Sequence, residues 1–317
     1  MAEGRSFPPA GRRRPRVVLL AYSEVGMRCL EALCALGSSV VGVFTYRDDP
    51  HEEIWFRSVA DGARAAGLPV HFESLRSPEG QEVLQGLAPD LLLSAYYRDL
   101  IAPEVLALAP GGAFNVHGSL LPRYRGRACI NWAILRGETE TGATLHEMVA
   151  RPDAGDVLDQ EAVPIDFEDT ALSVSLKVAD AAARILTRTW PLVEAGTAPR
   201  FPQDVTRASS FGRRGPEDGR IHWELPAREL YNLVRAVTHP WPGAFFSLRG
   251  KKIFVWRAFP EEGEETSPGE VLSVDPLRVG TGWGVLRLDR VQEEGDEERD
   301  GGLWGAARLR AGERLGA

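Results

Sequence analysis

The stretch PDLLLSAYYRDLIAPEVLALAPGGAFNVHGS, residues 89–119, contains the unit that decides the fold of this chain. It opens with a continuous apolar run, passes through APEVLALA, whose spacing suits a short helix, and returns to an apolar run in GAFNVHGS. A continuous apolar run predicts a strand that is buried on both faces, and a helix between two such strands predicts that they run parallel. This stretch therefore predicts a parallel sheet with helices packed against it.

The residues before this stretch show the same alternation. Apolar runs at 16–22 and 40–46 and the short segment PVHF predict three more strands, and each is followed by a helical pattern, the second of them at 53–67. We expect an α/β fold with a Rossmann-like, mostly parallel sheet and helices on both faces. The first strand leads into YSEVG and not into a glycine-rich phosphate loop, so nothing here predicts a bound dinucleotide.

The pattern changes after a short helix expected at 127–136. TGATLHEMV and GDVLDQEAVPI predict two strands with no long helix between them, and a long helix is expected at 171–196. Short strand-like runs separated by Gly and Pro follow, a pattern typical of a small OB-like β-barrel. The expected organisation is a disordered tail at 1–14, a catalytic domain at 15–200, a linker at 201–220 and an OB-like domain at 221–317.

The composition is that of an ordinary globular protein. The 317 residues are 44% hydrophobic and 26% charged. No apolar run approaches the roughly 20 residues that a membrane helix needs. The formal net charge of −8 disfavours a nucleic-acid surface, which usually needs a basic patch. Cys29, Cys34 and Cys129 lack metal-ligand spacing and suit a reducing compartment, so we expect a cytoplasmic protein without a bound metal. We also expect a monomer or weak dimer without membrane insertion.

Asn115 and His117 lie at the end of the last clear parallel strand, two residues apart and therefore on the same face. Ligands of open α/β sheets bind at the carboxyl ends of the strands, so both side chains are placed for a site. An amide can donate to a developing oxyanion, and an imidazole can move a proton. Asp153, in the turn RPDAGD, is a candidate for the group that holds the imidazole. The residues alone leave open that His117 is structural and that Asp153 only forms a turn.

Together with their neighbours, these residues resemble the signature of a known family. Asn115-Val116-His117, the following GSLLPRYRG and the downstream PDAGDV occur in the order and spacing found in folate-dependent formyltransferases. The resemblance covers about residues 16–311, nearly the whole chain, and is far more specific than any single motif.

Within that family the chain is most similar to the branch that formylates UDP-4-amino-4-deoxy-L-arabinose, the amino-terminal half of a bifunctional enzyme of lipid A modification and polymyxin resistance. The telling segments are SAYYRDLIAPEVLALAPGGAFNVHGSLLPRYRGRACINW, GETETGATLHEMVARPDAGDV, FGRRGPEDGRIHW and VRAVTHPWPGAF. The bifunctional relatives continue into an NAD-dependent decarboxylase domain, which these residues do not contain. We therefore expect either a stand-alone enzyme or a fragment, and no NAD chemistry.

The resemblance implies that 10-formyltetrahydrofolate is the co-substrate and that the 4-amino group of UDP-4-amino-4-deoxy-L-arabinose receives its formyl group. It implies that Asn115 stabilises the oxyanion, that His117 moves the proton and that Asp153 orients His117. It also implies a cis Leu121–Pro122 bond. The implied contacts to the folate are Asp99, Leu100, Ile101, Arg127, Val149, Ala150, Arg151, Pro152 and Asp153; for Arg127 the alternative is a surface residue.

The sugar-nucleotide side is marked more weakly. Arg213 and Arg214 in FGRRGPEDG are candidates for pairing with the diphosphate, and a solvated linker is the alternative. Tyr97 is placed either to line the cleft or to lie in the core. His146 and His239 are expected to be structural.

Three other functions fit parts of the same sequence. Methionyl-tRNA formyltransferase shares the fold and the three candidate catalytic residues, but it usually carries Ala at the position of Gly118 and needs basic surface for tRNA. A formyltransferase for another nucleotide-linked amino sugar fits the same motifs. A module that only binds folate, or that hydrolyses formyltetrahydrofolate, is the alternative of a different class, and a second domain dedicated to an acceptor favours transfer over it.

Overall fold

The computed structural model describes residues 13–50, 53–261, 263 and 266–316. The disordered tail expected at 1–14 lies almost entirely outside the described residues, which include only Arg13 and Arg14 of that segment. Nη1 of Arg14 donates to the carbonyl of Leu36 at 2.8 Å, so the start of the described chain is held at the end of the first helix.

By their contacts the residues group into two compact units. The first unit comprises the residues up to Cys129, Glu140–Pro164 and Ser175–Phe211, and the second comprises Ile130–Thr139, Ile165–Val174 and the residues from Gly212 onward. The second unit therefore includes two short segments that lie within the sequence of the first. The contacts change units between Phe211 and Gly212, and the domain boundaries expected at 200 and 220 stay a prediction.

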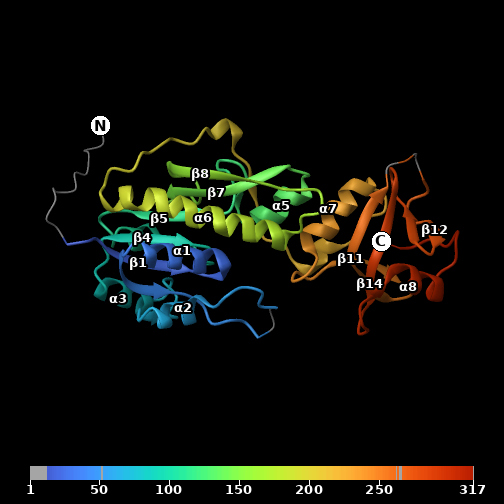
Figure 1. Ribbon diagram of the computed structural model, residues 1–317, viewed down its shortest axis with the longest axis horizontal. Coiled ribbons are helices and arrows are strands. Elements are labelled where there is room, and N and C mark those ends of the chain that lie inside the picture. The colour runs from blue at the N-terminus through green and yellow to red at the C-terminus, as the bar shows by residue number, and fades with distance from the viewer. Residues whose placement is uncertain (1–12, 51–52, 262, 264–265, 317) are drawn as a thin grey trace. The chain divides into compact units, whose positions relative to one another are not determined.

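The first unit is built around a seven-stranded sheet with the order β3-β2-β1-β4-β5-β7-β8 (Figure 1). Neighbouring strands from β3 to β5 pair parallel, whereas β7 is antiparallel to β5 and β8 is antiparallel to β7. The strands are β1 Arg16–Ala21, β2 Ser39–Phe44, β3 Val70–His71, β4 Leu91–Ala95, β5 Ala113–His117, β7 Glu140–Glu147 and β8 Val157–Pro164. The antiparallel pairing of β7 matters for the site because it sets residues of β7 directly opposite residues of β5.

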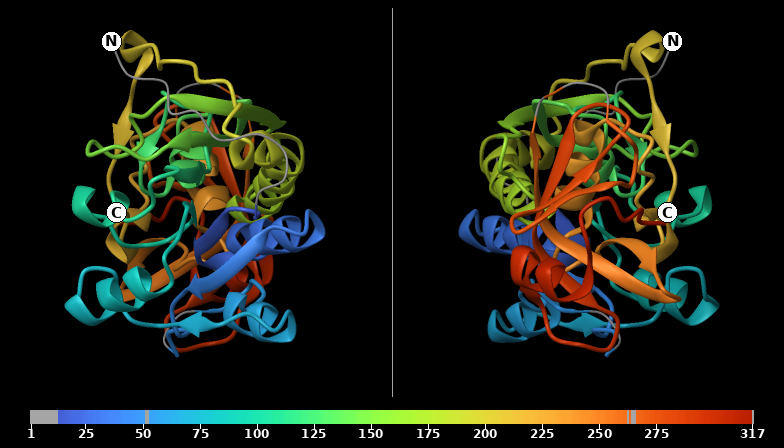
Figure 2. Two further views of the ribbon diagram at one scale, coloured as in Figure 1. Left: turned by 90° about the vertical axis from the view of Figure 1, so that its left-hand side faces the viewer. Right: turned by 90° about the vertical axis from the view of Figure 1, so that its right-hand side faces the viewer.

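Helices cover both faces of this sheet, and Figure 2 shows α6 (yellow-green) and α3 (cyan) on opposite sides of the strands. On one face, Trp190 of α6 packs edge-on against Phe114 of β5, with ring centroids 6.1 Å apart. On the other face, Leu20 of β1 belongs to a buried cluster with Leu84 of α3 and Val105 of α4. The helices are α1 Ser23–Ala35, α2 Val59–Ala65, α3 Pro78–Gly86, α4 Pro103–Leu106 and α6 Ala171–Glu194, which begins in the second unit.

The helix expected at 53–67 is shorter than its pattern suggests. It begins only at Val59, because the Ser58 side chain caps it by accepting a main-chain N–H of the first turn at 3.3 Å. Phe56 lies outside the helix and packs against Tyr22, with ring centroids 5.0 Å apart. The apolar residues before the cap therefore serve tertiary packing and not the face of a helix.

A small two-stranded pair stands apart from the main sheet. β6 Arg125–Gly126 pairs parallel with β9 Ser210–Phe211. β9 and the 3-10 turn η1 Val205–Arg207 lie in the segment expected to be a linker. By its contacts, the part of that segment up to Phe211 belongs to the first unit.

The second unit is a smaller antiparallel structure with the strand order β10-β11-β14-β13-β12, and β15 pairs with β14. Its strands are β10 Ala244–Leu248, β11 Lys251–Glu261, β12 Val271–Val274, β13 Leu277–Gly280, β14 Val285–Glu293 and β15 Arg299–Asp300. The remaining elements are α5 Cys129–Leu135, η2 Pro216–Gly219, α7 Ala227–Val237 and α8 Gly301–Arg308. The expected fold class, an α/β sheet with helices on both faces followed by a smaller β domain, is confirmed. In the described part of the chain, no helix has the length and apolarity needed to cross a membrane.

Candidate active site

Strand β5 presents Asn115 and His117 on one face, as their two-residue spacing predicts. The antiparallel pairing of β5 with β7 sets Asn115 directly opposite His146. Side chains that are directly opposite each other in such a pair lie within contact distance. A second imidazole therefore stands beside the amide on the same face of the sheet.

A main-chain carbonyl fixes the orientation of the buried His117 ring. Nε2 of His117 lies 2.9 Å from the carbonyl oxygen of Tyr124. A carbonyl can only accept a hydrogen bond, so in the neutral ring Nε2 carries the proton and Nδ1 keeps its lone pair. Nδ1 faces Oδ1 of Asp153 at 3.8 Å. One nitrogen thus holds the ring, and the other is available to take up a proton beside a carboxylate.

His146 has the opposite arrangement of its ring nitrogens. Nδ1 donates to the carbonyl of Glu147 at 2.7 Å, which leaves Nε2 as an acceptor for the Asn115 amide nitrogen at 3.1 Å. Burial, and secondly the charge on a protonated His117, lower the pKa of His146 to about 4. The ring therefore stays neutral near pH 7, and it holds the Asn115 side chain with its N–H₂ group toward β7.

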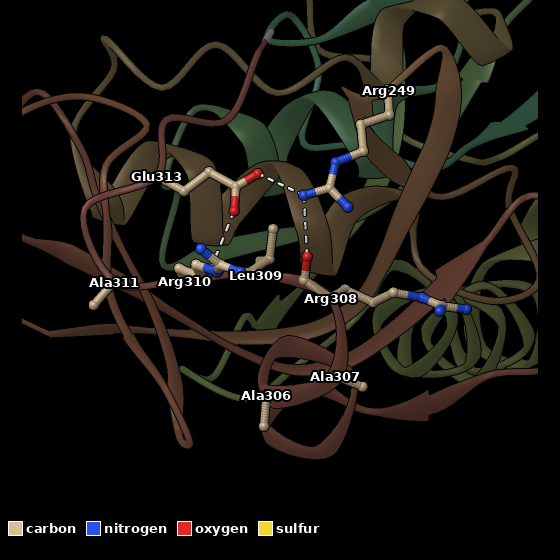
Figure 3. Close-up of a pocket in the computed structure, with 8 residues that line it drawn as sticks. All are labelled: Arg249, Ala306, Ala307, Arg308, Leu309, Arg310, Ala311 and Glu313. Carbon is tan, nitrogen blue, oxygen red and sulfur yellow. Dashed lines mark hydrogen bonds and ion pairs between the residues drawn. The ribbon is translucent and has the colours of Figure 1, made fainter.

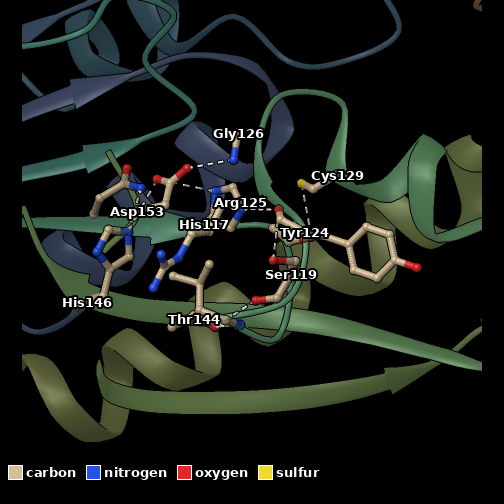
Figure 4. A network of polar contacts seen from close by, with 12 residues as sticks. His117, Ser119, Tyr124, Arg125, Gly126, Cys129, Thr144, His146 and Asp153 are labelled. Atoms are coloured by element: carbon tan, nitrogen blue, oxygen red, sulfur yellow. Dashed lines mark hydrogen bonds and ion pairs between the residues drawn. The ribbon is translucent and has the colours of Figure 1, made fainter. Parts of the chain in front are cut away.

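Asp153 completes the cluster from the turn that follows β7 (Figure 4). Its Oδ2 accepts the main-chain N–H of Gly126 at 2.8 Å. Its Oδ1 lies 3.8 Å from Nδ1 of His117 and 3.7 Å from Nε2 of His146. The resemblance implies that Asp153 orients His117. The structure assigns the orienting hydrogen bond to the Tyr124 carbonyl and places Asp153 at ion-pair distance.

The cluster combines three chemical capabilities within one small region. Asn115 uses one amide N–H on His146 and has a second for an oxygen that gains negative charge. His117 offers an unprotonated Nδ1, and Asp153 can stabilise the positive charge that a proton would bring to it. This set suits the attack of a neutral nucleophile on a carbonyl carbon.

The first loop expected to contact folate follows β4. The Asp99 N–H donates to the Tyr46 hydroxyl at 3.1 Å, and Oδ2 of Asp99 accepts from the Ser74 hydroxyl at 2.9 Å. Leu100 is 71% exposed, whereas Ile101 packs against the core cluster. The loop is thus anchored on both sides of one large apolar side chain that faces solvent.

The second loop follows β7 and contains Val149, Ala150, Arg151 and Pro152 ahead of Asp153. Val149 is 44% exposed, so this loop also presents a large apolar side chain to solvent.

Two further features that the sequence predicts lie in the segment after β5. Arg127 Nη2 donates to the carbonyl of Arg98 at 3.0 Å, so Arg127 links the segment after β5 to the loop after β4. The Leu121–Pro122 bond is cis, as the resemblance implies.

The residues proposed for the sugar nucleotide are divided between the units. Tyr97 packs against the core cluster of the first unit, and its ring lies 4.9 Å from that of Tyr46. Arg213 and Arg214 belong to the second unit. Arg214 lies 4.8 Å from the centre of the Trp132 ring, and Arg213 is exposed. Tyr97 therefore packs beside the core, and the two arginines belong to a different unit from the Asn115 cluster.

A separate concave region lies in the second unit and encloses about 790 Å³ (Figure 3). Its polar groups pair with one another, since Nη2 of Arg249 donates to Glu313 at 2.9 Å and to the carbonyl of Arg308 at 3.2 Å. Its lining contains no imidazole and no amide side chain. We therefore place the candidate active site on the β5–β7 face of the first unit.

Sequence reasoning missed two residues of this region. The sequence predicts only a structural role for His146, and the contact of this residue with Asn115 depends on the pairing of β5 with β7. Gln203 belongs to no motif, yet its side chain contacts the Asp153 turn. The alternation of TGATLHEMV is the one available signal for His146. It predicts which side chains share a face of the strand, but it does not predict which strand pairs with it.

Two family models match this chain in consecutive regions. The family model described as formyl transferase matches residues 27–190, and the model described as formyl transferase, C-terminal domain, matches residues 214–306.

Several solved structures share the fold. WlaRD, a sugar 3N-formyl transferase in the presence of dTDP and 5-N-formyl-THF, is 17% identical with a TM-score of 0.66 and covers 90% of this chain and 100% of its own. The N-formyltransferase from Helicobacter canadensis, in complex with folinic acid and dTDP-3-aminofucose, is 19% identical with a TM-score of 0.66 and coverages of 87% and 99%. HypX from Aquifex aeolicus in complex with tetrahydrofolic acid is 20% identical with a TM-score of 0.63, and 94% of this chain matches 49%, about half, of HypX.

Proposed function

Because this chain belongs to the formyl transferase family, we propose that it transfers a formyl group from 10-formyltetrahydrofolate to the amine of a nucleotide-linked amino sugar. The observation that carries the proposal is the convergence of Asn115, His117 and Asp153, with one amide N–H and the Nδ1 lone pair available to a substrate. Membership of the family makes the chain a transferase, and the donor, the acceptor and the residue roles below are part of the proposal.

Each of the three residues acts on a different part of the transfer. Asn115 donates its second N–H to the formyl oxygen as negative charge develops there, an effect of roughly 3–4 kcal/mol where one such donor has been removed in another enzyme. His117 accepts the proton that the amine loses as its nitrogen bonds to the formyl carbon, typically worth about 10²–10⁴-fold in rate. Asp153 stabilises the imidazolium formed in this way.

His117 then returns its proton to the folate nitrogen as the bond between that nitrogen and the formyl carbon breaks. The products are a formamide and tetrahydrofolate, and the imidazole is neutral again. Atoms and charges balance without a metal or a redox step.

The two loops beside the cluster fit the folate co-substrate. Leu100 and Val149 are large apolar side chains that remain exposed, and such surface commonly marks a binding site. A flat pterin ring would cover apolar side chains of this kind, and main-chain groups of the same loops could pair with its polar edge. The proposed contacts are Asp99, Leu100, Ile101, Arg127, Val149, Ala150, Arg151, Pro152 and Asp153.

For the acceptor we propose UDP-4-amino-4-deoxy-L-arabinose, which would yield the 4-formamido sugar used in lipid A modification. The ligands of two similar structures, dTDP and dTDP-3-aminofucose, support a nucleotide-linked amino sugar as the class. Arg213 and Arg214 are proposed to pair with the diphosphate, a recognition for which guanidinium groups are well suited.

Gly118 favours this acceptor class over methionyl-tRNA. A Cβ atom at position 118 would lie 1.9 Å from the hydroxyl oxygen of Tyr96, so the Ala that usually stands there in the tRNA branch would require Tyr96 to move. The tRNA branch remains an outcome of the test below.

The test measures tetrahydrofolate release from 10-formyltetrahydrofolate with and without the amino-sugar nucleotide. We expect acceptor-dependent release by the wild type and a loss on the order of 10²-fold or more in His117→Ala and in Asn115→Ala. His239→Ala, which removes a half-exposed imidazole of the second unit, is the matched control and should leave the rate unchanged. Release without acceptor would indicate a hydrolase, and turnover only with methionyl-tRNA or another amino sugar would reassign the acceptor.

A further inference from the structure

Gln203 joins two parts of the candidate active site through a single side-chain amide. Its Nε2 donates to the carbonyl of Asp153 at 2.9 Å and to the carbonyl of Gly155 at 2.7 Å. Its Oε1 accepts from Nε of Arg125 at 3.2 Å and from Nη2 of the same guanidinium at 2.6 Å. All four hydrogen bonds lie within the first unit.

These partners require an amide and leave no choice of its orientation. Two carbonyls can only accept and a guanidinium can only donate, so the –NH₂ group must face the turn and the oxygen must face Arg125. A Gln side chain has two N–H donors and an oxygen with two lone pairs, and all of them are used here. Glu at this position would keep the contact with Arg125 but would set a carboxylate oxygen against two carbonyls.

The Asp153 turn needs such support because of its backbone. Asp153 has φ +53°, in the left-handed region that side-chain-bearing residues adopt rarely. A residue in this region keeps its conformation only where the surroundings fix it. Here the Gly126 N–H holds one carboxylate oxygen and Gln203 holds the main-chain carbonyl. The remaining oxygen, Oδ1, is thereby directed at the two imidazoles.

The other end of the amide supports the segment that orients His117. Arg125 is only 3% exposed, so its charge needs a partner, and Gln203 supplies a neutral acceptor. Arg125 directly follows Tyr124, whose carbonyl holds Nε2 of His117. The same stretch of chain as Gln203 also contributes Ser209, whose hydroxyl accepts the Tyr124 N–H at 2.9 Å. The segment expected to be a linker thus touches both supports of the site.

From these contacts we infer that Gln203 is a positioning residue for formyl transfer, which sets the Asp153 carboxylate against His117 by tying the Asp153 turn to the Tyr124–Arg125 segment. The inference rests on the proposed function for its kinetic consequence. Its structural consequence, a fixed Asp153 turn, can be measured without any substrate.

The kinetic test uses Gln203→Glu, which removes both donors at nearly constant volume. We expect kcat to fall on the order of 10²-fold, the effect of a displacement of about 1 Å at reacting groups, with KM for either substrate little changed. The matched control is Gln292→Glu in the second unit, where the amide likewise accepts from a side chain, Trp256 Nε1 at 2.9 Å, and donates to a carbonyl, that of Asp296 at 2.8 Å. The control should keep the wild-type kcat.

A double-mutant comparison separates positioning from general damage. If Gln203 acts through Asp153, then Gln203→Glu should cost much less in an Asp153→Asn background than in the wild type, because coupled residues are not additive. Additive losses, or a rise in KM alone, would overturn the inference.

Amide exchange of Gly126, whose N–H donates to Asp153, gives the measurement that does not depend on turnover. We expect faster exchange of this single amide in Gln203→Glu and in Gln203→Ala, and no change in Gln292→Glu. If the wild type shows no transfer, the proposed function fails, while this measurement still decides whether Gln203 fixes the Asp153 turn. Unchanged exchange in both Gln203 variants would refute it.

Discussion

At the scale of single residues, the two buried histidines of the site differ in which ring nitrogen donates to a main-chain carbonyl. His117 donates through Nε2 to the carbonyl of Tyr124, which leaves Nδ1 unprotonated in the neutral ring. His146 donates through Nδ1 to Glu147 and accepts the Asn115 amide at Nε2. Because the pKa of His146 is lowered to about 4, this acceptor persists at neutral pH and Asn115 keeps one orientation.

The lowered pKa of His146 also predicts a loss of stability in acid. Between pH 6.5 and about 4 the unfolded chain binds a proton at this residue and the folded chain does not, so the free energy of unfolding falls as pH falls. The contribution approaches about 1.4 kcal/mol per pH unit inside this window and disappears above it. Gln at position 146 does not titrate, so His146→Gln should lose stability less steeply. Urea unfolding of both proteins across the window measures the slopes, and equal slopes would contradict the prediction.

Gly118, directly after His117, predicts a steric effect. A Cβ atom there would lie 1.9 Å from the Tyr96 hydroxyl oxygen and 3.3 Å from the Cys129 sulfur. We expect Gly118→Ala to lower the free energy of unfolding by about 1–3 kcal/mol, as overpacking of a core does, and to slow transfer. Gly86→Ala is the matched control, since a Cβ atom at position 86 would meet nothing within 4 Å and α3 should tolerate Ala. Thermal unfolding compares the two, and similar melting temperatures would count against the steric argument.

At the scale of elements, the strands of the first sheet could be predicted because strands buried on both faces consist of continuous apolar runs. Leu91, Leu92 and Leu93 of β4 are fully buried, as a strand covered on both faces requires. The shared face of Asn115 and His117 follows from the period of a strand in the same way. These are local properties of the chain, and local patterns report them.

The pairing of elements is a different matter. That β7 runs antiparallel beside β5, and so brings His146 to Asn115, depends on tertiary contacts that no local period encodes. The contact of Gln203 with the Asp153 turn could not be predicted for a related reason. It depends on the left-handed backbone of Asp153 and not on any pattern around Gln203 itself. A local motif therefore singles out Asn115, His117 and Asp153 as candidates, but it does not single out His146 and Gln203, which contact them.

Helix α7 predicts a further effect at this scale. Arg235 is 7% exposed and donates through Nη1 to the carbonyls of Asp166 and Asp169, at 3.2 and 3.0 Å. Arg235→Met would remove both of these charge-assisted hydrogen bonds and a third, from Nε to Oδ1 of Asn232 at 3.0 Å, so we expect a loss of roughly 2–4 kcal/mol in the free energy of unfolding. Arg228→Met on the same helix removes an exposed guanidinium that lies over Phe167, and it should change stability by only about 0.5 kcal/mol. Chemical denaturation of both variants tests the contrast, which equal losses would remove.

At the scale of the whole molecule, the units defined by contacts differ from the regions defined by family. The formyl transferase match runs unbroken through 27–190, yet Ile130–Thr139 and Ile165–Val174 have their contacts in the second unit. Asn131, for example, donates to the carbonyl of Ala236 at 2.7 Å. The assignment of these two segments to the second unit follows from tertiary packing, which composition and motif boundaries do not predict.

The net charge of the chain predicts how the molecule treats nucleic acid. A net charge of −8 offers no general attraction for phosphate backbones. We expect no shift of tRNA in a native gel at physiological salt. We also expect kcat/KM for the sugar nucleotide to change only a few-fold between about 50 and 200 mM salt, whereas a protein with 6–10 phosphate contacts loses about 10³–10⁵ in affinity. A tRNA shift with a steep salt dependence would favour methionyl-tRNA as the acceptor.

The backbone of Asp153 limits which amino acids evolution or a mutational library can place there. Its φ of +53° is adopted most readily by Gly, Asn and Asp and is avoided by β-branched and bulky residues. Of the three permitted types, only Asp carries a charge beside His117. A saturation library at this codon, sorted first for folded protein and then for turnover, should therefore enrich Gly, Asn and Asp in the first step and Asp alone in the second.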